Sequence, residues 1–361
     1  MNIKTIIMGA ALATVATGCT HSPEILVCGT YTDSGSRGVY SLRFDADAQT
    51  LEIIDSVESV NPSYVAFSPD KRMIYAVSEN GSLSGVYSIE FDPATGRFGR
   101  AYFEKNVGAD PCYVAVAGDY VVTADYSGGS LSFFQTDAKG RLIPSGRRDQ
   151  FTGCGPDTRR QASAHVHSAV VSPDERNMYV ADLGSDRLYC YEISNGQLAI
   201  VAQTVFDPGF GPRMSAIAPD GRHVYVLGEL SGEIAVFERD RTALRRVQTV
   251  VCDTLNERAA GDLHISRDGK YLYGSTRRRG DGIRVFAVGT DGLLSNCGFV
   301  PTAPHPRNFL ICSDDKYVLV ASRDANAIEV YSRDASTGIL TSTDIQVRLP
   351  KPVCLIAVGR R

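Results

Sequence analysis

Residues 164–194 read AHVHSAVVSPDERNMYVADLGSDRLYCYEIS and contain three short apolar runs separated by two polar turns. The first run ends at the turn that carries Asp174, and NMYVAD and RLYCYEI form the second and third runs. Runs of four to eight residues rich in Val, Ile and Tyr, bounded by turn residues, are typical of antiparallel strands. The stretch therefore predicts three consecutive strands.

The same arrangement recurs with different residues along most of the chain. Its copies are NPSYVAFSPDKRMIYAVSEN from Asn61, DPCYVAVAGDYVVTADYSGG from Asp110, GPRMSAIAPDGRHVYVLGEL from Gly211, AAGDLHISRDGKYLYGSTRR from Ala259 and HPRNFLICSDDKYVLVASRD from His305. Each copy is followed by a third strand such as GVYSIEF or EIAVFER, then by a turn and a more variable fourth strand. Four strands per unit at a period of about 45–55 residues indicate the blades of a β-propeller.

Six units are complete, and a seventh is divided between the two ends of the chain. EILVCGTYTDSGSRGVYSLRFD near the N-terminus provides its middle strands, and LPKPVCLIAV near the C-terminus provides its innermost strand. Pairing of the two ends closes the ring and leaves no open sheet edge. We therefore predict an all-β fold, a seven-bladed β-propeller of four-stranded blades, as a single domain over residues 25–361.

The first residues, MNIKTIIMGAALATVATGCT, have a basic start at Lys4, an apolar run and small residues that lead directly to Cys19. This pattern resembles a bacterial lipoprotein signal, in which the cysteine is acylated and becomes the mature N-terminus. The alternative is an ordinary secretory signal with an incidental cysteine. We predict a signal peptide over 1–18, lipidation at Cys19, a short tether over 19–24, and an exported protein anchored in the periplasm or at the outer membrane or cell surface.

Composition narrows the range of partners. A formal net charge of −4 gives no reason to expect nucleic acid, and we expect membrane contact only through the lipid anchor. Eight cysteines besides Cys19 include no C-x-x-C pair, and several lie inside apolar strands, so we expect mostly free, buried thiols. We expect a monomer that uses no cofactor and no metal.

Equivalent positions of the blades lie at equivalent places around a propeller channel. Aligning the units on the turn aspartate gives a first column, seven residues earlier, at the start of the innermost strand. Its members are Ser63, Cys112, His167, Arg213, Gly261 and Arg307. A second column, at the end of the second strand, holds Glu79, Tyr126, Leu183, Glu229, Arg277 and Arg323, with Asp182 beside Leu183.

The two columns should lie together around one mouth of the channel, because antiparallel neighbours begin and end at the same sheet edge. Their arginines suit an anion, since guanidinium forks match carboxylate or phosphate. His167 and Glu229 are candidates for proton transfer. Each residue also has a structural interpretation, as a pore-lining, capping or ion-paired side chain. His165 and His167 alone are a weak metal signal because no further ligands accompany them.

The motifs NPSY, ADYSGGS, HSAVVSPD, DLGSD, GPR, EL and STR, taken together, resemble the lactonase family of seven-bladed propellers. That family includes propeller-type 6-phosphogluconolactonases and carboxymuconate lactonising enzymes. The resemblance implies cofactor-free lactone chemistry, with the family's functional histidine, arginine, glutamate and second arginine falling on His167, Arg213, Glu229 and Arg277. Met214, Thr276 and Arg323 depart from the family pattern, so the substrate is open.

The leading hypothesis is therefore hydrolysis of a sugar or sugar-acid lactone at the channel mouth. His167, Arg213, Glu229 and Arg277 are the predicted catalytic residues, and the predicted substrate-binding residues are Arg307, Glu79, Tyr126, Asp182, Arg323 and His165. A carboxymuconate-type lactonising cycloisomerase and a non-catalytic propeller that binds a sugar-derived anion or a partner protein are the alternatives.

Overall fold

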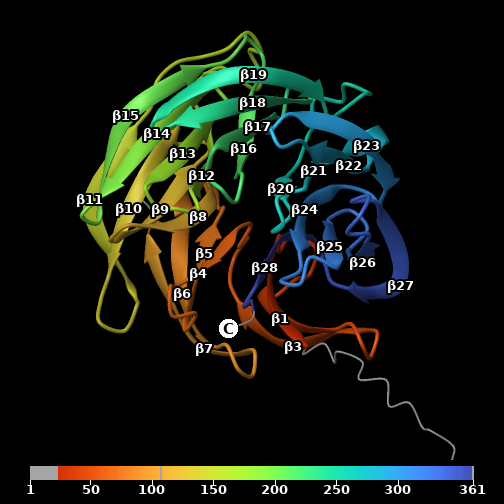
Figure 1. The fold of residues 1–361 in the computed structure, drawn as a ribbon. Coiled ribbons are helices and arrows are strands. Elements are labelled where there is room, and N and C mark those ends of the chain that lie inside the picture. The colour runs from red at the N-terminus through yellow and green to blue at the C-terminus, as the bar shows by residue number, and fades with distance from the viewer. Residues whose placement is uncertain (1–22, 106–107, 360–361) are drawn as a thin grey trace, which may run out of the picture.

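The computed structural model describes residues 23–105 and 108–359, and within them the chain forms seven four-stranded antiparallel sheets. The sheets stand around a ring, as Figure 1 shows. The prediction of an all-β, seven-bladed propeller is confirmed. The predicted signal peptide, Cys19 and all but the last two residues of the predicted tether lie outside the described residues.

The blades are numbered here from the one that contains both ends of the chain. Blade 1 consists of β28 (Pro352–Ala357), β1 (Glu24–Thr30), β2 (Gly38–Asp45) and β3 (Thr50–Glu58). Blade 2 consists of β4 (Val65–Phe67), β5 (Met73–Ser78), β6 (Gly85–Asp92) and β7 (Arg97–Lys105). Blade 3 consists of β8 (Pro111–Ala117), β9 (Tyr120–Asp125), β10 (Ser130–Thr136) and β11 (Leu142–Gln150).

The other four blades are, like blades 2 and 3, continuous in sequence. Blade 4 consists of β12 (Val166–Val171), β13 (Asn177–Asp182), β14 (Arg187–Ser194) and β15 (Gln197–Val205), and blade 5 of β16 (Pro212–Ile217), β17 (His223–Gly228), β18 (Glu233–Asp240) and β19 (Ala243–Val251). Blade 6 consists of β20 (Leu263–Ile265), β21 (Tyr271–Thr276), β22 (Gly282–Val288) and β23 (Leu294–Pro301), and blade 7 of β24 (Pro306–Ile311), β25 (Tyr317–Ser322), β26 (Ala327–Arg333) and β27 (Leu340–Arg348). Two short 3₁₀ helices, η1 (Gly81–Leu83) and η2 (Arg278–Gly280), lie in loops.

Blade 1 closes the ring as the split repeat predicted. β28 pairs antiparallel with β1, with Leu26 opposite Ala357 and Cys28 opposite Leu355. The last strand of the chain thus becomes the innermost strand of the blade that the first strand begins, and the two lie side by side in Figure 1. The first and the last strand of the chain are therefore hydrogen-bonded to each other in the closed ring.

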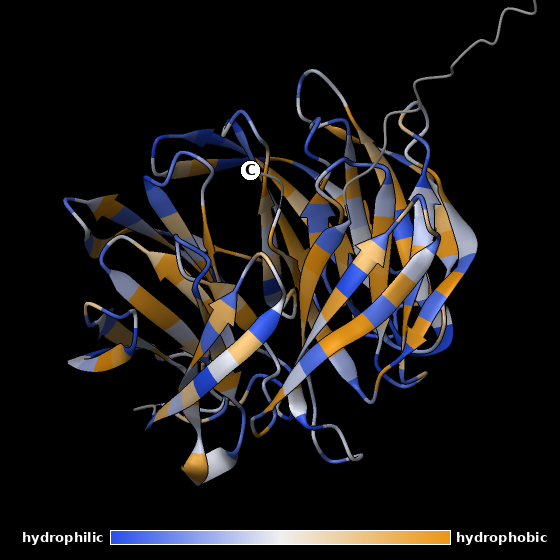
Figure 2. Cartoon of the chain, turned by 90° about the horizontal axis from the view of Figure 1, so that it is seen from below, coloured by the Kyte–Doolittle hydropathy of each residue, from blue (hydrophilic) through white to orange (hydrophobic). Residues whose placement is uncertain are grey.

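Position in the blade determines how apolar each strand is. β13 and β17 are buried at every residue because neighbouring blades cover both of their faces. The outermost strand β15 is mostly exposed, with only Leu198 fully buried. Figure 2 shows hydrophobic segments spread over the strands of the ring, whereas most connecting loops are hydrophilic. The core is therefore a series of layers between adjacent blades.

The turn aspartates used to align the repeats organise the inner hairpins. In blade 4 the Oγ of Ser172 donates to Asp174, and Asp174 also accepts from the backbone N–H of Arg176 at 3.3 Å. Ser68 with Asp70 and Ser266 with Asp268 repeat the contact in blades 2 and 6. These side chains satisfy backbone donors that the turn leaves outside the sheet, so the aspartate recurs for a structural reason.

A β-bulge in the innermost strand marks the first column. The register shifts between Val166 and Ser168, so His167 has no partner in the ladder. The same shift occurs at Cys112, Arg213 and Arg307. A bulge leaves the extra residue unpaired and re-aims its side chain. In five blades the residue two positions earlier has a left-handed backbone: Asn61, Asp110, Gly211, His305 and Lys351, with φ between 42° and 63°.

A buried polar chain joins the innermost strands of blades 6, 7 and 1. Asp262, directly before β20, accepts hydrogen bonds from Nδ2 of Asn308 at 2.5 Å and from Nε2 of His264 at 2.8 Å. Asn308 on β24 in turn accepts from the backbone N–H of Leu355 on β28 at 2.7 Å. Asp262 and Asn308 are almost completely buried. The chain therefore ties three blades together beside the closure.

Replacing Asn308 by Ala should lower the free energy of unfolding by about 2–3 kcal/mol, because it removes one donor from the buried carboxylate of Asp262 and leaves the buried N–H of Leu355 without its partner. Urea unfolding measures the change. Asn296→Ala, at an exposed position of β23, is the matched control and should stay within about 0.5 kcal/mol of the native protein. Equal stability of the two variants would contradict the structural role given to Asn308.

Candidate active site

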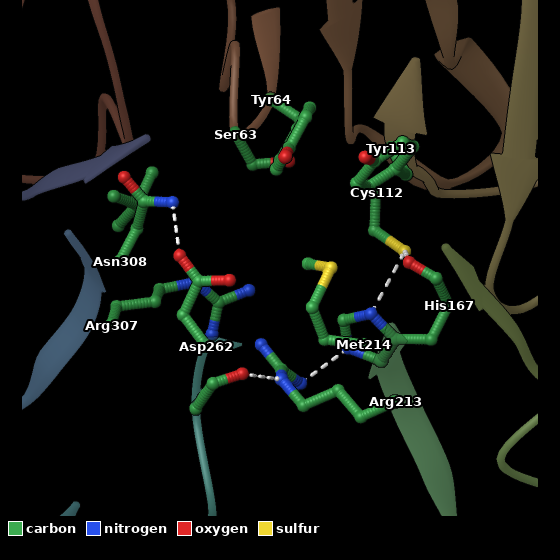
Figure 3. A pocket seen from close by; sticks show the side chains of 12 residues that line it. Ser63, Tyr64, Cys112, Tyr113, His167, Arg213, Met214, Asp262, Arg307 and Asn308 are labelled. Atoms are coloured by element: carbon green, nitrogen blue, oxygen red, sulfur yellow. Dashed lines mark hydrogen bonds between the residues drawn. The ribbon is translucent and has the colours of Figure 1, made fainter. Parts of the chain in front are cut away.

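All six residues of the first column line one pocket: Ser63, Cys112, His167, Arg213, Gly261 and Arg307. Tyr64, Tyr113, Met214, Asp262, Asn308 and Val353 complete its lining. Figure 3 shows these side chains converging from several blades. At Cys112, His167, Arg213 and Arg307 the bulges explain the convergence, because they turn equivalent residues of different innermost strands toward the same space.

The guanidinium of Arg213 is the centre of the pocket's hydrogen bonding. Its Nε donates to the carbonyl of Gly261 at 2.5 Å, and its Nη1 contacts both Nε2 of His167 and Oε2 of Glu229. Figure 3 shows the contact with His167. Since a guanidinium only donates, Nε2 of His167 is the acceptor, and the neutral ring carries its proton on Nδ1. That nitrogen faces Sγ of Cys112 at 3.8 Å.

The carboxylate of Glu229 holds three arginines together. Besides Arg213, it binds Nη2 of Arg160 at 2.7 Å and lies 3.4 Å from Nη2 of Arg277. Arg277 is fixed by hydrogen bonds to the carbonyls of Ala259 and Ala260. His167 Nε2 lies 3.9 Å from Oε2 of the same carboxylate. The four residues assigned to catalysis from the sequence are thus in one contiguous cluster.

Burial and charge set the protonation of this cluster. Burial, reinforced by Arg213, lowers the pKa of His167 well below its ordinary value of 6.5, so the imidazole is neutral at neutral pH. Burial alone would raise the pKa of Glu229, but Arg213 and Arg277 lower it well below 4.5. Both proton acceptors are therefore unprotonated at neutral pH, and they titrate as an interacting pair.

Arg307 forms a second branch of the site. Its guanidinium lies over the ring of Tyr31 at 5.1 Å from the centroid, and Nη2 donates to the Tyr31 hydroxyl at 2.7 Å. That hydroxyl donates to Oε2 of Glu79 at 2.9 Å. Arg307 and Glu79, both predicted to bind substrate, are thus linked through a tyrosine. The branch places a further cation beside the pocket.

Tyr126 and His165 lie beside His167 and are not among the residues that line the pocket. Their rings stack at 4.6 Å between centroids, and Nδ1 of His165 lies 2.9 Å from the carbonyl of Tyr126. Tyr126 also meets the ring of His167 edge-on at 5.5 Å. His165 thus supports the tyrosine, while His167 occupies the bulge that faces the pocket.

These features can be compared with known proteins. Residues 25–357 match the family model described as "Lactonase, 7-bladed beta-propeller". The chain belongs to the lactonase family of seven-bladed β-propellers.

Three relatives illustrate the similarity to this family. The chain is 31% identical to a Bacillus subtilis protein named 6-phosphogluconolactonase, covering 91% of this chain and 96% of that protein. A solved structure from Bacteroides fragilis is 36% identical, with a TM-score of 0.91 over 95% of this chain and 99% of that one. The Pseudomonas aeruginosa periplasmic gluconolactonase is 30% identical, with a TM-score of 0.86 over 94% and 99%.

Two residues of this lactonase-family chain that were expected to bind substrate point elsewhere. Asp182 is fully buried, and its carboxylate accepts from the backbone N–H groups of His165 and Gly184 and from Ser185. Its contacts hold the inner hairpin of blade 4, which is a structural role. Arg323 binds Asp324 through a two-point contact at 2.8 and 3.1 Å, so its charge is already paired.

The departures from the lactonase pattern also have structural contacts. Met214 is buried and provides an apolar part of the pocket lining. Thr276 is buried, and its Oγ1 donates to the carbonyl of Gly280, which holds the turn of η2. Neither change disturbs the contacts among Arg213, His167 and Glu229.

Sequence reasoning missed Tyr31, Val353 and Arg160. Tyr31 and Val353 are the second- and first-column residues of the split blade: Val353 is unpaired at a bulge, and the N–H of Tyr31 bonds to the carbonyl of Lys351. Glu79, Tyr126, Leu183, Glu229 and Arg323 make the equivalent backbone bond in their own blades. Extending the register across the chain ends would have found both residues. Arg160 lies in a loop outside the repeat, where no register applies.

Over residues 23–105 and 108–359, no group of three or more His, Cys, Asp or Glu side chains is placed to hold a metal ion. Within the same ranges, no helix has the length and apolar character needed to cross a membrane. Among the cysteines described, Cys154 and Cys297 are exposed, while the other six are buried free thiols.

Replacing Glu229 by Gln should destabilise this lactonase-family fold by about 3 kcal/mol, because it leaves Arg213 and Arg277 buried without their counter-charge. Inorganic phosphate should then restore more stability to this variant than to the native protein, since an anion can take the place of the carboxylate. Urea unfolding with and without phosphate tests both effects. Glu238→Gln, which removes an exposed ion pair with Arg245, should cost less than about 1 kcal/mol. A Glu229→Gln variant as stable as this control would refute the charge balance described.

Proposed function

We propose that this protein hydrolyses a sugar or sugar-acid lactone in the pocket formed by the first-column residues. The observation that carries the proposal is the guanidinium of Arg213, held between two unprotonated acceptors, His167 and Glu229, at the wall of a cation-rich pocket. The names of the Bacillus subtilis and Pseudomonas aeruginosa relatives, a 6-phosphogluconolactonase and a gluconolactonase, support lactone chemistry.

In this mechanism, a water molecule attacks the lactone carbonyl carbon, and the His167–Glu229 pair takes one of its protons. Arg213 and Arg277 stabilise the negative oxygen of the tetrahedral intermediate by directed N–H groups. The ring C–O bond then breaks, and the pair returns the proton to the leaving ring oxygen. The products are an open-chain hydroxy acid and the proton that this acid releases on ionisation.

Charge in the pocket favours an acid product or an anionic substrate. Arg160, Arg213 and Arg277 surround a single carboxylate, and Arg307 adds another cation opposite Glu79. With three carboxylates, Glu229, Glu79 and Asp262, against four guanidinium groups, the site carries an excess positive charge that a carboxylate or phosphate can balance. An exported protein would meet unphosphorylated compounds, so the lactones of sugars and of sugar acids are the proposed substrate class.

Arg213→Gln and His167→Gln should each reduce kcat/KM for the best lactone by about 10²–10³-fold, because each removes a group that acts on the developing charge or the proton. A panel of sugar lactones followed by proton release measures this rate. Arg245→Gln, at an exposed position of β19, is the control and should retain full activity. Near-UV circular dichroism verifies that the variants are folded.

The same purified protein distinguishes the alternative functions. Loss of muconate absorbance without proton release from any lactone would indicate a lactonising cycloisomerase instead. Tight calorimetric binding of an aldonate without turnover would indicate a binding propeller. Unchanged lactone turnover in both Arg213→Gln and His167→Gln would refute the mechanism itself.

We also propose that the protein is exported and held to a membrane through a lipid on Cys19. The small residues before Cys19 and the apolar run of residues 5–16 support this location. The periplasmic gluconolactonase among the relatives supports the compartment.

Cys19→Ser should move the protein from the membrane fraction to the soluble fraction of the cell or medium, because a single acylated cysteine provides the anchor. Fractionation and labelling with a radioactive fatty acid measure this. Cys154→Ser, an exposed cysteine of the propeller, is the matched control. Label on the Cys19→Ser variant, or soluble native protein, would contradict the anchor.

A further inference from the structure

Arg160 reaches the candidate active site from a part of the chain that the repeat does not supply. It lies in the connection between β11 and β12, whereas Arg213 and Glu229 lie on or beside the inner strands of blade 5. Its Nη2 nevertheless bonds to Oε1 of Glu229 at 2.7 Å and lies 3.4 Å from the hydroxyl of Tyr126. A loop of one blade thus places a cation on the carboxylate of another.

The loop that carries Arg160 is anchored on both sides of it. Gln161 is fully buried and donates to the carbonyl of Leu183 at 2.9 Å and to Asp186 at 2.8 Å. On the other side, Asp157 accepts from the N–H of Arg160 and pairs with Arg258 at 2.7 Å. The backbone at Arg160 is therefore fixed, and only its side chain has freedom to change partner.

Arg160 is also the outermost cation of the cluster. A third of its side chain (33%) is exposed, against 7% for Arg213 and 5% for Arg277. An anionic ligand that approaches from solvent meets this guanidinium before the buried ones. Because the guanidinium offers several donors in a planar fork, it can bind a carboxylate or phosphate with two hydrogen bonds.

Glu229 needs to lose a partner before it can accept a proton efficiently. In the structure Oε2 is engaged by Arg213, and Oε1 by Arg160 with Arg277 at 3.4 Å. These cations hold the pKa of Glu229 well below its ordinary value despite burial, which weakens it as a base. Moving Arg160 from Glu229 to an incoming anion would remove the 2.7 Å contact on Oε1, leave only Arg277 at 3.4 Å beside that oxygen, and so strengthen the base.

We propose that Arg160 is a specificity-determining and positioning residue that transfers from Glu229 to the anionic group of the substrate and so activates the His167–Glu229 pair when an anionic lactone is bound. The proposal rests on the proposed lactone hydrolysis and makes Arg160 the residue that discriminates lactones with an anionic group remote from the ring carbonyl from neutral lactones. No covalent bond is made or broken in the transfer, because Arg160 only exchanges hydrogen bonds with Glu229 for hydrogen bonds with the substrate anion.

Three lactones of one sugar series test the proposal: neutral glucono-1,5-lactone, its 6-phosphate, and a glucarolactone with a C6 carboxylate. In Arg160→Gln the preference for an anionic over the neutral lactone, as a ratio of kcat/KM, should fall about 10–100-fold, the loss of a charge-assisted contact. Arg160→Lys should restore part of it, since it retains the charge but not the fork. The phosphate and carboxylate arms show which anion the site prefers.

The pH dependence of kcat/KM provides a second measurement, and the loss of a purely structural contact at Arg160 would not change it. Losing Arg160 removes a cation from Glu229, so the apparent pKa of the pair rises and the acid limb of kcat/KM for the neutral lactone shifts to higher pH. Arg159→Gln removes the same charge at the adjacent exposed position and should leave both the ratio and the acid limb unchanged. An equal loss of activity on all three lactones with an unshifted acid limb would overturn the proposal.

Binding measurements separate this proposal from the hydrolase function. Calorimetry with gluconate and 6-phosphogluconate needs no turnover. Tighter binding of 6-phosphogluconate that disappears in Arg160→Gln would support the Arg160 contact even if the native protein hydrolysed no lactone, an outcome that refutes only the proposed function. Equal affinity of the native protein and Arg160→Gln for 6-phosphogluconate would overturn the Arg160 contact even if lactone hydrolysis were observed.

Discussion

The candidate site depends on the pairing of β28 with β1. That pairing joins residues 352–357 to residues 24–30 and completes the seventh blade, so the ring has a fixed number of blades and a fixed curvature. Only in a closed ring do equivalent bulges on successive innermost strands aim at one point. The convergence of His167, Arg213 and Arg307 is thus a consequence of closure. The polar chain from Asp262 through Asn308 to Leu355 reinforces it where the chain ends meet.

Within the closed ring, one buried carboxylate, that of Glu229, offsets the free-energy cost of burying several arginines. Arg213 and Arg277 are almost fully buried, and each would be costly without a counter-charge. Glu229 serves both, and it is the same group whose proton affinity the proposed chemistry requires. Stability favours full pairing of the Glu229 carboxylate with the arginines, whereas the proposed proton transfer requires that carboxylate to have fewer cationic partners. In the proposed mechanism, Glu229 therefore stays paired with the surrounding arginines until an anionic ligand binds one of them.

The sequence predicted the fold, and it predicted that most residues of the candidate site would lie together, because both follow the repeat. All six first-column residues line one pocket, and Glu229 and Arg277 contact Arg213 or its partner. The repeat did not predict the contacts of Asp182, whose carboxylate faces backbone donors of its own hairpin. Tyr31 and Val353 belong to the same register but are separated by the chain ends. Arg160 could not be predicted, since its position depends on how an irregular loop folds back across two blades.

The contacts of Arg213 help to distinguish an enzyme from a propeller that only binds its ligand. A pocket that only captures anions needs cations and a counter-charge such as Glu229, but it does not need a neutral imidazole acceptor on the same guanidinium. Here the acceptors His167 and Glu229 contact the same Nη1 atom of Arg213. The group that would bind a developing oxyanion therefore lies within hydrogen-bonding distance of the groups that would move its proton. An arrangement in which charge stabilisation and proton transfer share one atom favours catalysis over capture.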